Sequence, residues 1–122
     1  RCVLAQIQER ALPIAEVMQE LREWLRQFPK PVFIGFPAAF DFAFVHWYWW
    51  YFFNTEPPFS HSALDIKTLA MSQLMCGYRD TGKKKLRKML PQAFSNSLPH
   101  THFGLDDAKE QALLFKTLME MI

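Results

Sequence analysis

The pattern of apolar and polar positions divides the chain into several helical segments and one short strand. Between residues 12 and 28, apolar residues recur every three or four positions with charged residues on the opposite side, which predicts an amphipathic helix. The run "PVFIGF" at 31–36 contains β-branched residues and is bounded by proline and glycine, so it predicts a buried strand. Helical patterns return at three places: 38–53, 63–75 with Ser62 as N-cap, and Leu105 to the last residue.

A single strand cannot form a sheet, so the strand at 31–36 requires a partner. We expect that partner either in strands upstream of Arg1 or in a second copy of the chain. At 122 residues, half of them hydrophobic, the chain has the length of one folded domain, and disorder is excluded. We therefore predict a single domain over residues 1–122, apparently shortened at its N-terminus so that helices dominate.

Composition excludes several classes of protein. A formal charge of +2 is too small to mark the whole chain as nucleic-acid binding, so such a role depends on where charges cluster. Two cysteines without a C-x-x-C pair indicate neither a disulfide framework nor a structural zinc site, and we expect a reducing, cytoplasmic location. The densest apolar run, 40–53, is shorter than the roughly 20 residues of a membrane span, and the N-terminus lacks the apolar core of a signal peptide.

Titratable groups gather at the expected starts of two helices. Asp41 follows the predicted strand, and its neighbours Phe40 and Phe42 suggest a partly desolvated carboxylate that needs a cation. In "HTHFGLDDAKEQALLF" at 100–115, His102 precedes the helix and Asp107 lies in its first turn, so both can face one cleft. The alternative is that these acids only complement the helix dipole and that the histidine is an exposed loop residue.

Three stretches together resemble a known family: "PVFIGFPAAFDFAFV", "HSALDIKTLA" and "LPHTHFGLDDAKEQALLF". They are similar to the DEDDh group of 3′–5′ exonucleases in the RNase H-like superfamily, and to its branch of small exoribonucleases typified by a mycobacterial enzyme. The resemblance runs from Ile14 to Met119 and implies an α/β, RNase H-like exonuclease fold. It also implies that Asp41 and Asp107 bind Mg²⁺ or Mn²⁺ and that His102 is the general base.

This assignment is chemically sound, because two carboxylate-held ions about 4 Å apart can generate a nucleophile and stabilise the leaving oxygen of a phosphodiester. A histidine can accept the proton of the attacking water near neutral pH. However, the family's first motif, D-x-E, is absent, since none of the five aspartates is followed two positions later by glutamate. We expect that motif to precede Arg1, and the chain to be weakly active or inactive without it.

Two further clusters suggest contacts with partners. Beside an exonuclease-like site, basic residues between 79 and 88 would bind the phosphate backbone, the alternative being a solvated charged loop. Aromatic residues at 47–53 are too many for one buried face, which favours a homodimer interface over base stacking. The predicted substrate contacts are Lys83, Lys84, Lys85, Arg87 and Lys88.

The sequence favours a metal-dependent 3′–5′ exonuclease that acts on single-stranded RNA or DNA and releases nucleoside 5′-monophosphates. A second hypothesis is a catalytically inactive RNase H-like module that binds nucleic acid or protein. A third is an oligomeric helical protein whose acidic residues only cap helices. The choice between RNA and DNA depends on contacts to the 2′-hydroxyl, which the sequence does not locate.

Overall fold

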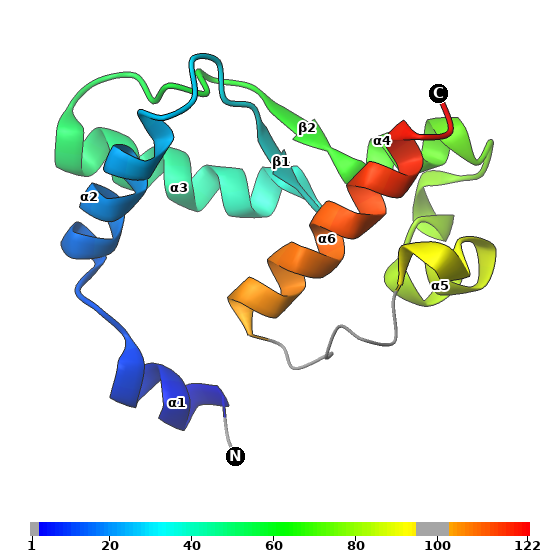
Figure 1. Ribbon diagram of the computed structural model, residues 1–122, viewed down its shortest axis with the longest axis horizontal. Helices are drawn as coiled ribbons and strands as arrows, with labels where there is room; N and C mark the ends of the chain where they lie inside the picture. The colour runs from blue at the N-terminus through cyan, green and yellow to red at the C-terminus, as the bar shows by residue number, and fades with distance from the viewer. Residues whose placement is uncertain (1–2, 95–102) are drawn as a thin grey trace. The chain divides into compact units, whose positions relative to one another are not determined.

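The computed structural model describes residues 3–94 and 103–122 and divides the chain into two units, Arg1–Leu64 and Asp65–Ile122. Each unit has buried side chains of its own. The colours of Figure 1 follow the chain from the N-terminus in blue to the C-terminus in red. The elements, in chain order, are α1 (Val3–Arg10), α2 (Ile14–Leu25), β1 (Phe33–Gly35), α3 (Ala38–Phe53), β2 (Ala63–Asp65), α4 (Ile66–Gln73), the 3₁₀ helix η1 (Tyr78–Asp80), α5 (Lys83–Met89), the 3₁₀ helix η2 (Pro91–Ala93) and α6 (Gly104–Met119).

Most of the predicted elements are confirmed. Helix α3 has the predicted bounds, β1 lies within the predicted strand, and α6 begins one residue before the predicted start. Helix α2 is shorter than the predicted segment and ends at Leu25, four residues before Pro29. Helix α1, which is eight residues long, was not predicted from the sequence.

The segment after residue 62 differs from the prediction. Residues Ala63–Asp65 form β2 rather than the first turn of a helix, and α4 begins only at Ile66. The N-cap is Asp65, not Ser62, since the Asp65 carboxylate accepts hydrogen bonds from the backbone N–H and the hydroxyl of Thr68 at 2.9 and 2.6 Å. Strand β2 pairs with β1 in a small two-stranded parallel sheet, so the predicted strand has its partner within the chain.

In the first unit, α2, α3 and β1 enclose an aromatic core. Its buried members are Met18, Leu25, Trp49 and Phe59. At the turn from β1 into α3, a Cβ atom on Gly35 would lie 2.8 Å from the Cα atom of Ala38, so this close approach requires glycine. The turn places the start of α3, and with it Asp41, directly after the strand.

In the second unit, α4, α5 and η2 supply the apolar residues that pack with α6. The core residues are Ile66, Ala70, Leu86, Leu90, Ala93, Leu114 and Leu118. On α6 the buried positions are Glu110, Leu114 and Leu118, which follow one another at four-residue spacing and form one face. Helix α6 therefore anchors this unit along the face that begins one turn after Asp107.

The architecture is mostly helical with a small parallel sheet, which is compatible with the α/β class expected from the sequence. Among the helices of the described residues, none combines the length and the apolar character that crossing a bilayer requires.

Candidate functional site

The first candidate ligand, Asp41, lies in the first turn of α3 in the first unit. Its side chain is exposed, and Phe40 beside it is exposed as well. The expectation of partial desolvation is therefore wrong, because Asp41 is exposed to solvent. An exposed carboxylate at a helix start is accessible to a cation and is stabilised by the helix dipole.

The second candidate ligand, Asp107, lies in the first turn of α6 in the second unit. The turn is closed by the backbone N–H of Asp107, which donates to the carbonyl of Phe103 at 2.9 Å. The carboxylate is one-third exposed, and its Oδ1 atom lies 3.8 Å from Nζ of Lys83. His102, the predicted general base, lies outside the described residues.

The predicted substrate-binding residues lie on a helix, α5, rather than on a loop. Three of the five cations have acidic partners within the second unit. Lys85 pairs with Asp80 of η1, and this contact lowers the pKa of Asp80. Lys83 and Arg87 pair with Glu110 of α6, as described below. Only Lys84 and Lys88 are exposed and form no ion pair with another described residue.

Glu110 is the centre of a partly buried charge network. Only 7% of the residue is exposed. Its Oε1 atom lies 2.9 Å from Nζ of Lys83, and its Oε2 atom accepts a hydrogen bond from Nη2 of Arg87 at 3.2 Å. The Arg87 guanidinium also lies 5.2 Å from the centre of the Phe94 ring. The network ties α5 to α6 one turn after Asp107.

The pKa of Glu110 reflects opposing effects. Burial by itself would raise the pKa, but Lys83 and then Arg87 favour the ionised carboxylate and hold the pKa below its ordinary value of 4.5. A carboxyl group whose pKa is lower in the folded state stabilises the fold above its unfolded pKa. That stabilisation is lost as the pH falls through the folded pKa.

We therefore expect acid to destabilise the protein partly through Glu110. The melting temperature should stay level as the pH is lowered to about 5. At lower pH it should decrease, because the Glu110 carboxylate becomes protonated and loses its ion pairs. The Glu110→Gln variant should melt at a lower temperature at pH 7 and show a smaller further loss in acid. Thermal melts followed by circular dichroism at several pH values test this, and equal acid sensitivity of the two proteins would contradict it.

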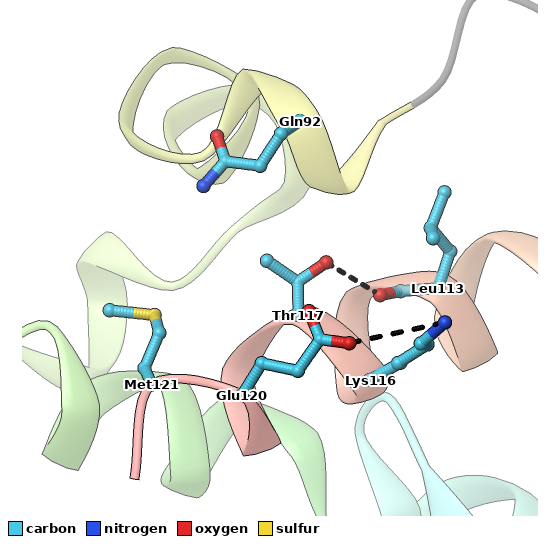
Figure 2. Close-up of a pocket in the computed structure, with 6 residues that line it drawn as sticks. All are labelled: Gln92, Leu113, Lys116, Thr117, Glu120 and Met121. Atoms are coloured by element: carbon cyan, nitrogen blue, oxygen red, sulfur yellow. Dashed lines mark hydrogen bonds and ion pairs between the residues drawn. The ribbon is translucent and has the colours of Figure 1, made fainter.

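A hollow of about 370 Å³ lies beside the C-terminal half of α6. Figure 2 shows that its polar groups are partly satisfied by the helix itself. The Thr117 hydroxyl donates to the carbonyl of Leu113 at 2.9 Å, and Lys116 lies 3.9 Å from Glu120. Gln92 and Met121 complete the lining. Because no predicted site residue lines this hollow, we do not include it in the candidate site.

The aromatic residues of α3 divide between core and surface, as the sequence analysis expected. Trp49 is 3% exposed, whereas Trp47 is 59% exposed and stacks on Tyr51 at a ring distance of 5.0 Å. Phe40 and Phe44 are also exposed and lie in edge contact. These four exposed residues, spaced by four, three and four positions, form one aromatic face of α3.

The donor chemistry of the candidate ligands fits a hard divalent cation. Asp41 and Asp107 are both accessible carboxylates, and Mg²⁺ is commonly held by one or two carboxylates together with water and substrate phosphates. Within residues 3–94 and 103–122, no group of three or more His, Cys, Asp or Glu side chains is arranged to hold a metal. Each of the two aspartates, taken by itself, therefore matches such an ion in chemical type.

Glu110 is not among the site residues predicted from the sequence. Two signals in the sequence point to it: it follows Asp107 by three positions, which places both on one side of the helix, and it continues the Leu114 and Leu118 spacing of the apolar face. A charged residue at an apolar position of an amphipathic helix is expected to have a paired partner.

The chain is similar to a curated protein of known activity. It is 30% identical over 108 residues to the 3′–5′ DNA exonuclease Cap18 of Escherichia coli. The alignment covers 84% of this chain but 54% of that protein, so the chain spans about half the length of its relative. No protein-family model matches the sequence. The similarity supports a relationship to 3′–5′ exonucleases, as the sequence motifs suggested.

Proposed function

We propose that this chain carries a metal-dependent 3′–5′ exonuclease domain of the DEDDh group with an RNase H-like fold. Its substrate is a single-stranded nucleic acid, DNA in the first place, from which it releases nucleoside 5′-monophosphates. One observation carries the proposal. The H-x-G-x-x-D motif ends in the first turn of α6, in a chain that is 30% identical over most of its length to a DNA exonuclease.

The residues have separate roles in this proposal. Asp41 and Asp107 contribute carboxylate oxygens to Mg²⁺ or Mn²⁺, which when bound neutralises charge at the scissile phosphate and activates water. His102 accepts the proton from the attacking water on a ring nitrogen. The exposed lysines of α5 contact the phosphates of the bound strand. The exposed aromatic face of α3 is the surface through which a homodimer would form.

A second candidate is a non-catalytic module that binds nucleic acid without cleaving it. The observation in its favour is that no aspartate of the chain is part of a D-x-E motif. In the family that the motifs resemble, this motif supplies two further metal ligands. The two candidates differ in one measurable respect, since both bind a single strand but only the first shortens it.

The test is degradation of 5′-labelled single-stranded DNA and RNA by the purified chain, with Mn²⁺ or Mg²⁺ and with a chelator control. The exonuclease predicts a ladder that shortens from the 3′ end, requires the metal and runs further on DNA. Bound but intact substrate would overturn the exonuclease in favour of the binding module. The absence of both binding and cleavage would overturn both candidates.

A further inference from the structure

Of the five cations of α5, Lys85 pairs with Asp80 of η1, and the other four form two pairs with different surroundings. Lys83 and Arg87 are four residues apart, and both contact Glu110 of α6, at 2.9 and 3.2 Å. Lys84 and Lys88 are also four residues apart, but both are exposed and neither forms an ion pair with a described side chain. Because residues four apart share a helix face, each pair occupies its own side of α5.

The buried carboxylate of Glu110 explains this division. A charge taken out of water is tolerated only when it is paired, so Glu110 requires the cations that face it. Each of its two oxygens contacts one of them, Oε1 with Lys83 and Oε2 with Arg87. Both cations are thereby held against α6, and the ammonium of Lys83 also lies 3.8 Å from Asp107.

A neutralised cation contributes little to binding a phosphate backbone. The affinity gained from such contacts comes from the release of counterions by cations that meet phosphate directly. Lys83 and Arg87 already face carboxylate oxygens, whereas Lys84 and Lys88 project from α5 without a described ionic partner. Lys85 is also exposed but pairs with Asp80, so Lys84 and Lys88 are the exposed lysines of this helix that have no described ionic partner and remain for phosphate.

We infer that Glu110 is a positioning residue that divides the cations of α5, holding Lys83 and Arg87 in the fold and leaving Lys84 and Lys88 to bind phosphate. The inference rests on the proposed nucleic-acid substrate. It goes beyond that proposal because it excludes Lys83 and Arg87 from the predicted substrate contacts. It also assigns their separation from Lys84 and Lys88 to Glu110, a residue of another helix.

The experiment measures binding of a fluorescent oligothymidylate by the full chain in a chelator, as a function of salt. The logarithm of the affinity falls linearly with the logarithm of salt, and for single strands the slope reports about 0.7 per phosphate contact. The Lys84→Gln/Lys88→Gln variant should have a slope shallower by about 1.4. A charge-matched control on α6, Lys109→Gln/Lys116→Gln, should keep the slope of the unaltered protein.

Glu110→Gln tests the positioning role. The inference predicts that this variant binds the oligonucleotide more tightly, whereas a loss of structure would weaken binding. Freed from the carboxylate, Lys83 and Arg87 become available to phosphate, so the slope should steepen by up to about 1.4 and binding should tighten. Its control, Glu120→Gln, removes the same charge from a residue that faces only Lys116 at 3.9 Å and should leave the slope unchanged. Circular dichroism checks that each variant is folded.

The outcomes separate this inference from the proposed function. If the oligonucleotide does not bind at all, both are overturned. If the oligonucleotide binds but the salt slope of Lys84→Gln/Lys88→Gln changes no more than that of Lys109→Gln/Lys116→Gln, the inference alone fails. This comparison tests the inference even if Glu110→Gln does not fold. A folded Glu110→Gln protein with an unchanged or shallower slope also overturns the inference. If the slopes are as expected but the strand is not cleaved when metal is added, the inference is supported and the proposed exonuclease activity is wrong.

Discussion

Replacing Asp107 by asparagine is expected to reduce metal-dependent shortening of single-stranded DNA by at least about a hundredfold, because the amide removes the charge that holds the cation. Asparagine has nearly the same shape as aspartate, so α6 and its 2.9 Å first-turn hydrogen bond should remain. The measurement is the initial rate of nucleotide release in Mn²⁺ or Mg²⁺, beside binding of the same strand in a chelator. Binding should be retained while cleavage is lost.

The matched control is Asp106→Asn, one residue earlier in the same helical turn. It removes the same charge from the same first turn, where both acids complement the helix dipole, but Asp106 is not a proposed metal ligand. If both variants lose cleavage equally, the effect belongs to the acidic helix start in general, and the specific role of Asp107 is wrong. If Asp107→Asn cleaves like the unaltered protein, the exonuclease assignment at this motif fails.

Replacing Trp49 by alanine is expected to lower the free energy of unfolding by about 3–5 kcal/mol, the usual loss when a buried aromatic side chain is removed. Trp49 is 3% exposed, and its ring centre lies 4.9 Å from that of Phe53 and 6.0 Å from that of Phe59. The substitution therefore leaves a cavity in the core of the first unit. Urea denaturation followed by far-UV circular dichroism measures the change.

Trp47→Ala provides the matched control, since it removes the same side chain from the same helix two residues earlier. Trp47 is 59% exposed and contacts mainly Tyr51 and Tyr48, so at protein concentrations low enough to keep the chain monomeric its removal should cost less than about 1 kcal/mol. Equal losses for the two variants would mean that the exposed aromatic face is covered in solution, as a homodimer through that face would require.

The outcome at the candidate site shows which kinds of residue a sequence places correctly. Asp107 was expected in the first turn of a helix and lies there, because helix starts follow from local periodicity and local hydrogen bonds. The five cations between 83 and 88 that were assigned to substrate could not be divided from the sequence into those that pair within the fold and those that stay exposed. Their separation depends on Glu110, a residue 23 positions after Arg87 that meets them only in the folded unit.

The same distinction holds for the fold. The sequence predicted α3 with its observed bounds and the start of α6 to within one residue, because a long helix is specified by contacts within three or four positions of each residue. It did not reveal β2, which is three residues long and exists because β1 lies beside it. The sequence by itself therefore determined α3 and the motif at the start of α6, and it located α2 and α4 approximately. Only the tertiary structure decided the strand partner and which cations of α5 are neutralised, because both depend on residues that are distant in the chain.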